Sequence, residues 1–579
     1  MARKPDQKLT QRLFSPDYFR HRLADTDALP QMALLGLIAG VASALIIIGF
    51  RSLFELPLAH WLPSGTAEGF ESLPTLWHFL LPIIGGGLIG LWLMLFKAKA
   101  RQTGVTHVMQ RMLNHKGYMP FKNTLVQFFG GALAIITGQS GGREGPAVHL
   151  GAAISSQLGR FWQLPDNSIR TLVGCGTAGA IAASFNTPMA GVIFAMEVVM
   201  LEYTVVGFTP IIISAVTATL VHNSLYGAEM AFMAPNIAFV SLQELPLILI
   251  YGVIFGALAA LFTKTVTVSL SVGDKPVMLR MLGAGLVTGL LASQVPQIMG
   301  VGTDSILAAI EGKYAIQLLL MLALAKLFAT AVSVGLGMPI GLIGPTLLIG
   351  ASAGGALGLI SQELITAPIS TSGFYAMLGM AAMMSAVLQA PLAGLIALLE
   401  LTHNPEVILP GMAVVVMANF TCRYIFKQDS TFIEVLRRQG VTLQDNSINQ
   451  SLTQRGVTSL MDDQIAHHAD YDMTGVNKSI TQGKDWLLVY KENEITAVIA
   501  SQDLALDQLQ ESIYQAKSTA AREFGFCSSR ATLREAWDLS QNHDYDYLLI
   551  TDLDEQVIGV LPTNKITHLM QQSSPFQPS

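Results

Sequence analysis

Residues 141–151 read Gly-Gly-Arg-Glu-Gly-Pro-Ala-Val-His-Leu-Gly, and they place two charges inside a long apolar region. Charged side chains at the centre of a bilayer are costly, so Arg143 and Glu144 mark a candidate functional site. The glycines permit close backbone approach, and Pro146 suits the first turn of a helix, where its missing N–H leaves nothing unsatisfied. The stretch therefore predicts a helix that begins inside a membrane.

A helix start presents unpaired backbone N–H groups and the positive end of the helix dipole, which together attract anions. The Glu144 carboxylate is itself an anion, so it would compete with a dissolved anion for the same donors. Glu144 would leave when it is protonated or displaced, as a gate does. The alternative is a Glu144 side chain held permanently by Arg143 or by a neighbouring helix. His149, just over one turn later, either tunes this protonation or is a packing residue.

The composition is that of a polytopic membrane protein. Of 579 residues, 51% are hydrophobic and 13% charged, and the mean hydropathy is +0.48. Soluble proteins of this size are rarely so apolar. A bilayer crossing takes about 20 apolar residues, and segments approach that length at 31–50, 76–96, 245–262, 318–334 and 407–426. The net charge of −6 is modest, and no basic tract points to nucleic acid, so we expect small solutes, the lipid bilayer and membrane subunits as partners.

The N-terminal residues 1–30 carry an excess of Lys and Arg ahead of the first apolar segment, without a short apolar core and cleavage site. This pattern predicts a retained, cytoplasmic segment. Three cysteines, Cys175, Cys422 and Cys527, lie far apart and show no metal-ligand spacing. We therefore expect neither a metal nor a resident cofactor.

An internal repeat is the strongest signal in the chain. Residues 175–193 align without gaps to residues 378–396, and the match continues to Glu197 over Glu400. Chance similarity between apolar helices is the alternative, but the ordered motifs argue against it. The two halves therefore share one plan.

The repeat also includes the opening stretch. Gly145 and Pro146 match Gly344 and Pro345. Paired repeats in transporters place broken helices near the bilayer midplane, with their ends at a shared site. We therefore expect residues 341–345 to face the same anion through backbone N–H groups alone, because this copy lacks the charges.

The composition changes sharply from about residue 428 onward, where the chain becomes charged and has no apolar spans. Residues 458–509 and 532–570 each predict the order helix, strand, strand, helix. Compact strands are expected at 547–550 and 557–561, on either side of a turn. This part predicts a small soluble α+β region of two similar units.

These motifs resemble the CLC family of chloride channels and proton/chloride antiporters. Residues 142–146 reproduce the family's Gly-Arg-Glu-Gly-Pro motif, and residues 341–345 stand at its Gly-x-Phe-x-Pro motif. Residues 185–191, Phe-Asn-Thr-Pro-Met-Ala-Gly, and 408–410, Ile-Leu-Pro, also fit. The likeness covers residues 31–440, and the C-terminal part resembles a pair of CBS units.

The resemblance implies an all-α polytopic membrane protein with the inverted-repeat, broken-helix CLC architecture, plus a small α+β cytoplasmic CBS-like domain. It implies a homodimer with one anion pathway per subunit, in the plasma (inner) membrane, with both termini cytoplasmic. The implied bounds are 1–30 for the N-terminal segment, 31–427 for the transmembrane domain with repeats at 31–230 and 240–427, 428–456 for a linker, and 457–579 for the CBS-like pair with units at 457–510 and 522–572.

The resemblance also assigns site residues, with Glu144 as the gating glutamate. The family's Gly-Ser-Gly-Ile-Pro motif falls on residues 102–106, Gln-Thr-Gly-Val-Thr, which keep a hydroxyl but lose the first glycine and the proline. Phe432 falls where the family has a tyrosine, and it has no hydroxyl to donate. The implied anion-binding residues are Thr103, Gly104, Arg143, Gly145, Leu342, Ile343, Gly344 and Phe432, for chloride or a similar small anion.

The expected mechanism depends on the pair Glu197-Val198. In many antiporters of this family two consecutive glutamates stand here, and the second relays protons from the cytosol. Valine supplies no titratable group, so the resemblance favours passive, channel-like chloride movement. Proton/chloride exchange is the alternative, because a proton can travel by water and Glu197 or Glu202 is near. Glu197 itself is expected to be structural, since Glu400 occupies the same place in the other half.

Two other classes of protein share single features with this sequence. Residues 138–141, Gly-Gln-Ser-Gly, match the motif of rhomboid-like intramembrane serine proteases, in which a later histidine, here His222 or His403, would activate Ser140. A protease explains neither the repeat nor the charged site, so we expect no enzyme. A sodium-coupled carrier of organic anions would need more intramembrane polar ligands.

The C-terminal region raises the question of a nucleotide. CBS units that bind nucleotides often end in Gly-x-x-Thr-x-x-Asp. Residues 559–565 place Lys565 where the ribose-binding acid would be, and residues 497–503 keep only Asp503. Adenine nucleotide is therefore a weak expectation, and a dimerisation and assembly module is the simpler one.

Overall fold

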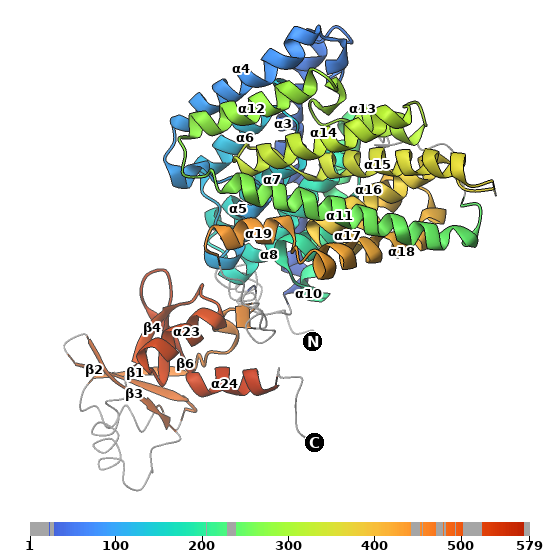
Figure 1. Cartoon of the computed structure of the whole chain (residues 1–579). Coiled ribbons are helices and arrows are strands. Elements are labelled where there is room, and N and C mark those ends of the chain that lie inside the picture. Colours follow the sequence, from blue (N-terminus) through green and yellow to red (C-terminus); the bar gives the residue numbers. More distant parts are fainter. Residues whose placement is uncertain are drawn as a thin grey trace, which may run out of the picture. The chain divides into compact units, whose positions relative to one another are not determined.

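The computed structural model describes residues 23, 28–203, 205–227, 239–366, 368–441, 452–453, 455–469, 479, 482–491, 494–501 and 524–572 (Figure 1). Most of the predicted N-terminal segment, and Asp503, lie outside the described residues. The chain divides into two compact units. The first contains Met1–Met32, Phe161–Ile169 and Gln444–Ser579, and the second, here called the membrane unit, contains Ala33–Arg160 and Arg170–Leu443.

In the described chain, seven helices are long and apolar enough to cross a membrane. They confirm the predicted apolar segments. Only 44% of the apolar window in α3 is buried in the protein, against 83% in α15, so α15 lies inside the helix assembly. The seven are α3 (Leu29–Trp61), α4 (Thr75–Met94), α10 (Val205–Tyr226), α11 (Leu245–Leu270), α14 (Ile316–Gly335), α15 (Ile343–Leu364) and the segment Pro405–Ile425, which contains α18 (Ile408–Phe420).

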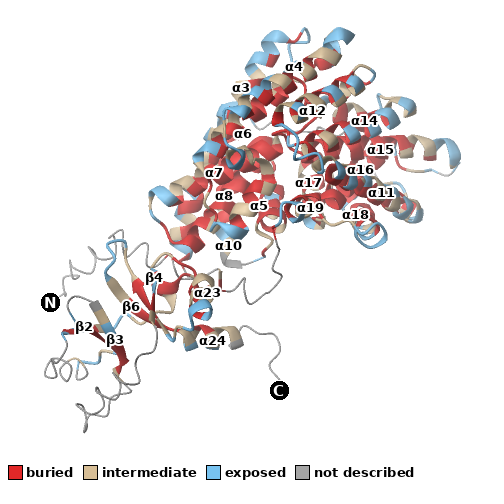
Figure 2. Ribbon diagram, turned by 60° about the vertical axis from the view of Figure 1, so that its left-hand side comes forward, coloured by how far each residue is buried: buried red, intermediate tan, exposed pale blue. Residues whose placement is uncertain are grey.

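Shorter helices complete the membrane unit. The chain is a mostly helical, multi-pass membrane protein, as predicted. Figure 2 shows buried residues concentrated on the central helices α7, α8, α15 and α16. The shorter helices are α5 (Gly104–Asn114), α6 (Phe121–Ile136), α7 (Glu144–Phe161), α8 (Asp166–Phe185), α9 (Pro188–Phe194), α12 (Val277–Ala292), α13 (Thr303–Ile310), α16 (Ser372–Leu388), α17 (Pro391–Thr402) and α19 (Thr431–Arg438). Helix α19 falls inside the expected linker and belongs to the membrane unit.

The repeat seen in the sequence is also a repeat in packing. In the first half, Gly151 of α7 meets Gly176 of α8 so closely that a Cβ on either glycine would meet the carbonyl oxygen of the other. In the second half, Gly350 of α15 and Gly379 of α16 meet in the same way. These are aligned positions of the two copies, and small residues permit such close helix packing in membranes.

Two carboxylates tie the halves to each other reciprocally. Glu197 accepts hydrogen bonds from the backbone N–H groups of Leu392 at 3.3 Å and Ala393 at 2.7 Å, at the start of α17. Glu400 accepts from the N–H groups of Met189 at 2.9 Å and Ala190 at 2.6 Å, at the start of α9. Each carboxylate thus satisfies helix-start donors of the opposite repeat, where a negative charge is favoured.

The C-terminal part of the first unit holds two three-stranded sheets of one topology. β1 (Ile465–Ala469) pairs parallel with β2 (Trp486–Lys491), which pairs antiparallel with β3 (Glu494–Ala500). The second sheet repeats this with β4 (Phe524–Ser528), β5 (Tyr547–Thr551) and β6 (Val557–Pro562), accompanied by α23 (Leu533–His543) and α24 (Thr563–Gln572). The predicted order helix, strand, strand, helix is confirmed for residues 532–570. The helices expected in residues 458–509 fall largely outside the described residues.

Candidate anion pathway

The two glycine-rich motifs meet backbone to backbone. Gly142 and Gly341 form an isolated antiparallel bridge, with N–H to oxygen distances of 2.8 Å and 2.7 Å. Helix α7 begins two residues later at Glu144, and α15 begins at Ile343. The sequence analysis predicted both helix starts. The bridge brings the N-termini of two helices, with their unpaired N–H groups, to one place.

Glu144 lies in a pocket made of glycines. Its side chain is fully buried. A Cβ on Gly142, Gly341 or Gly344 would come within 3 Å of a Glu144 carboxylate oxygen, so the carboxylate fits only because these residues have no side chain. The backbone N–H groups of Glu144 itself and of Gly344 are the hydrogen-bond donors that act on this carboxylate. An ionisable group this deeply buried in a membrane protein marks a functional position.

The Arg143 side chain contacts residues other than Glu144. Its guanidinium donates to the carbonyl oxygen of Ser184 at 2.9 Å and lies 3.5 Å from the Glu55 carboxylate of α3. It also sits over the Phe185 ring, 5.0 Å from the centroid. Arg51 binds the same Glu55 oxygen at 2.8 Å. The structure therefore places the Arg143 side chain in contacts other than an ion pair with Glu144.

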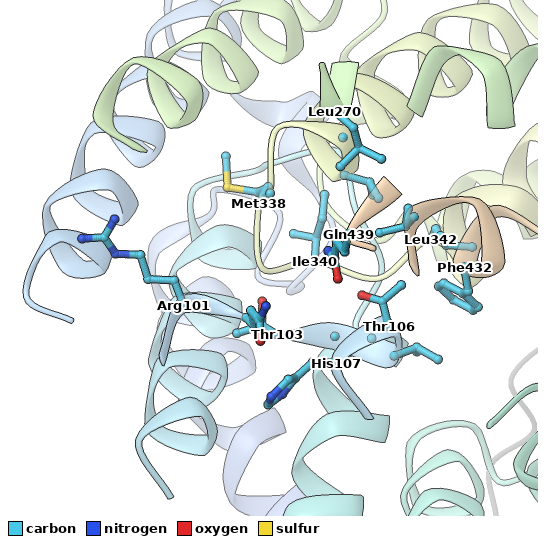
Figure 3. Close-up of a pocket in the computed structure, with 18 of the residues that line it drawn as sticks. Arg101, Thr103, Thr106, His107, Leu270, Met338, Ile340, Leu342, Phe432 and Gln439 are labelled. Carbon is cyan, nitrogen blue, oxygen red and sulfur yellow. The ribbon is translucent and has the colours of Figure 1, made fainter. Parts of the chain in front are cut away.

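A cavity of about 260 Å³ lies next to the bridge. Figure 3 shows Thr103 and Thr106 of the α5 region facing Leu342 and Phe432. The structure brings several predicted site residues together here and leaves Arg143, Glu144 and Gly344 off the cavity wall. The predicted residues that line it are Thr103, Gly104, Gly145, Leu342, Ile343 and Phe432.

The turn into α5 shapes one wall of this cavity. Thr103 caps the helix without a side-chain capping bond, and Gly104 takes a positive φ of 74°, which favours glycine. The Gly104 N–H, expected to face the anion, donates to Oε1 of Gln127 at 2.7 Å. The Gln127 side chain in turn donates to the carbonyl oxygen of Pro339 at 3.0 Å. Gln127 therefore links the first repeat to the loop before the second motif, and the sequence analysis missed it.

The position of the missing relay carboxylate is apolar and closed. Val198 is 3% exposed. Glu197 is engaged by the start of α17, and Glu202 forms an ion pair with Arg170 at 3.2 Å. Both acids considered as neighbours of a proton route thus have structural partners.

Lys326 of α14 is a second site residue absent from the sequence analysis. It is fully buried, and its ammonium donates to the carbonyl oxygens of Ile298 at 2.9 Å and Gly300 at 2.8 Å. Glu144 and Glu68 are its electrostatic partners. A lone lysine within the apolar stretch of α14 was the signal that could have identified it.

Glu68, in the connection between α3 and α4, is a further acid in this region. Its carboxylate accepts from the N–H groups of Thr303 at 2.6 Å and Asp304 at 3.2 Å, at the start of α13. Burial raises the pKa of Glu68, and the Arg143 charge opposes that rise. Arg143 and Lys326 are therefore electrostatic partners of both Glu68 and Glu144.

The serine of the protease-like motif has no catalytic neighbour in the described residues. Ser140 Oγ lies 3.1 Å from the hydroxyl of Thr330. His222 instead lies 3.4 Å from Arg51, and it stacks on Tyr226. The arrangement lacks the serine–histidine contact that nucleophile activation needs.

Comparisons with known proteins agree with this geometry. The family model described as voltage gated chloride channel matches residues 85–423. The H+/Cl− exchange transporter ClcA of Vibrio campbellii is 31% identical over 390 residues, covering 65% of this chain and 82% of the relative. A relative described as a chloride channel protein, ClcB-like, from Ralstonia nicotianae is 31% identical over 394 residues, covering 66% of this chain and 91% of the relative.

Solved structures share the fold. A slow cyanobacterial Cl−/H+ antiporter aligns with a TM-score of 0.62 at 22% identity, covering 70% of this chain and 97% of that chain. A CLC-type fluoride/proton antiporter gives 0.59 at 24%, covering 70% and 98%. A eukaryotic CLC transporter gives 0.57 at 18%, covering 94% and 98%.

The fold and site define a multi-pass membrane protein in which two broken-helix repeats meet at Gly142 and Gly341. The chain belongs to the CLC family of voltage gated chloride channels and related transporters. Members of this family are transporters or channels and not enzymes, which removes the protease alternative.

Proposed function

We propose that the protein moves chloride through the cavity and past Glu144, in exchange for protons. The observation that carries this proposal is the Glu144 carboxylate, buried among three glycines where α7 and α15 begin. Helix N-termini favour an anion at such a place. An ionised Glu144 would exclude chloride there, and protonation would release the position, so one side chain links the two ions.

The names of similar proteins support proton coupling. The ClcA relatives are named as H+/Cl− exchange transporters, and two of the similar structures are titled antiporters. Passive chloride conduction, which the sequence analysis favoured, is the second candidate. Val198 supports it, because valine cannot carry a proton.

The test uses purified protein in liposomes under a chloride gradient, with chloride efflux and external pH recorded together. We expect proton uptake coupled to chloride efflux, and we expect Glu144→Gln to abolish the proton movement while chloride still flows. The control variant is Leu364→Gln, which changes an exposed residue at the end of α15. Chloride flux without proton movement in the unmodified protein would refute exchange and leave passive conduction.

We propose further that two copies form a homodimer in the plasma (inner) membrane, with both termini in the cytoplasm. Large exposed apolar side chains on α9, α17 and α18 support a subunit contact, and they include Met189, Leu392, Leu409, Met412 and Val416. Light scattering in detergent would give the mass of a dimer, whereas the mass of a monomer would assign these faces to lipid.

The C-terminal region is proposed to be a CBS-like pair, on the evidence of its two sheets of equal topology. Adenine nucleotide remains a secondary hypothesis. Lys565, at the position of the ribose-binding acid, forms an ion pair with Asp462 at 2.5 Å, which argues against it. Calorimetry on the full chain that showed no heat with ATP, ADP or AMP would remove the hypothesis.

A further inference from the structure

Two buried histidines meet in the membrane unit. Nδ1 of His107, on α5, lies 2.9 Å from Nε2 of His149, on α7. The rings are stacked, with centroids 5.1 Å apart and planes inclined by 25°. At this distance one nitrogen donates a proton to the other, so the pair already shares a hydrogen bond along which a proton can move.

The two rings differ in their surroundings. His107 is one of the residues lining the cavity and keeps 3% of its surface exposed, whereas His149 is fully buried. Figure 3 shows the His107 ring at the edge of the cavity, directed away from Phe432. The pair therefore runs from the cavity edge into the protein, toward α7.

The inner end of the pair is unpaired. Nδ1 of His149 is buried and has no hydrogen-bond partner among the described residues. A buried polar atom without a partner is costly, so packing alone does not explain a histidine here. His149 follows Glu144 by five residues on the same helix, which is about 7.5 Å along the helix axis. The two side chains leave that helix about 140° apart, so a proton needs water to pass from His149 to Glu144.

The charges around the pair are basic. Arg111, on α5, and His115, which directly follows α5, act electrostatically on His107, and His107 acts on His149. Glu144 is the acid at the start of the helix that carries His149. The pair is thus suited to passing a proton toward an acid rather than to forming an ion pair of its own.

We propose that His107 and His149 form a proton-transfer site between the cavity and Glu144, in place of a carboxylate at position 198. The inference rests on the proposed exchange. A proton from cavity water binds Nε2 of His107, the Nδ1–H bond of His107 breaks as Nε2–H of His149 forms, and Nδ1 of His149 releases its proton toward Glu144. One proton enters and one leaves, and no electron is transferred. Each ring then returns to its first tautomer by exchanging protons with water, because return along the shared hydrogen bond would carry the proton back to the cavity.

The test measures proton and chloride fluxes together in liposomes for His107→Gln and His149→Gln. We expect proton flux to fall by about 100-fold, the lower range for loss of a positioned proton-transfer group, while chloride efflux persists. Persisting chloride efflux also shows that each variant folds. His60→Gln is the matched control, because His60 is exposed in the last turn of α3 and is not among the groups that act on the pair.

A second variant tests whether the histidine pair takes the place of a carboxylate at position 198. Adding Val198→Glu to His149→Gln is expected to restore proton flux, because it supplies a carboxylate at the position the family's relay occupies. Unchanged coupling in both histidine variants would overturn the proton-transfer site and leave exchange intact. Chloride flux without any proton flux in the unmodified protein would overturn both proposals.

Discussion

The starts of α7 and α15 are copies of one motif, yet they differ in chemistry. The first carries Arg143 and Glu144, and the second carries Leu342 and Ile343 at the aligned positions. The supporting parts of the two repeats are alike, from the glycine contacts to the reciprocal carboxylates. The difference teaches that the duplicated scaffold supplies the geometry, while one copy alone supplies the titratable group.

The largest effect is expected from moving the carboxylate from the first copy of the motif to the second. We expect Glu144→Ile combined with Ile343→Glu to reduce proton movement to the background of empty liposomes, because the glycine pocket accommodates the side chain of residue 144. The measurement is external pH under a chloride gradient. Ile343→Val is the control and is expected to retain exchange. Restored proton movement in the transplanted variant would show that the two copies are interchangeable.

The glycine contacts allow a test of the likeness between the repeats. Gly151→Ala and Gly350→Ala each push a methyl group against a backbone carbonyl oxygen, so we expect each to lower the free energy of unfolding in detergent by about 1–3 kcal/mol. Gly87→Ala is the matched control, since its nearest neighbour would lie at an ordinary 3.6 Å. A loss in only one repeat, measured by thermal unfolding, would contradict equal packing.

The reciprocal carboxylates should give smaller and equal effects. We expect Glu197→Ala and Glu400→Ala each to cost about 1–2 kcal/mol, because each leaves two N–H donors at a helix start unpaired. Chemical unfolding in detergent measures the cost, and the glutamine variants, which keep an acceptor oxygen, are the controls. If Glu197→Ala alone abolished proton movement, Glu197 would be a relay and not a structural residue.

Much of the scaffold could be predicted because its signals are local. The apolar lengths predicted the spans, and the order Gly-Pro at both motifs predicted the starts of α7 and α15. The aligned Glu197 and Glu400 predicted a shared structural role, and the structure shows them bound to the opposite repeat. The strands at 547–551 and 557–562 also follow from a short apolar run on each side of a turn.

The polar contacts inside the membrane unit could not be predicted. Gln127 joins residues 23 and 212 positions away, and His107 meets a residue 42 positions away. A polar side chain on an apolar helix shows that a partner is needed but not which one, because helix periodicity contains no information on packing between helices. For this reason the sequence did not show that the Gly104 N–H donates to Gln127.

The bridge between Gly142 and Gly341 also has a consequence for biosynthesis. Its two hydrogen bonds join residues made far apart in time, since synthesis at about 5–20 residues per second separates them by roughly 10–40 s. During that interval the backbone groups of Gly142 have no partner from the later repeat, and unpaired groups in hydrocarbon are costly. Until residue 341 has been added, the backbone N–H and carbonyl groups of Gly142 therefore need another partner, such as water, and the bridge between the repeats forms only after that.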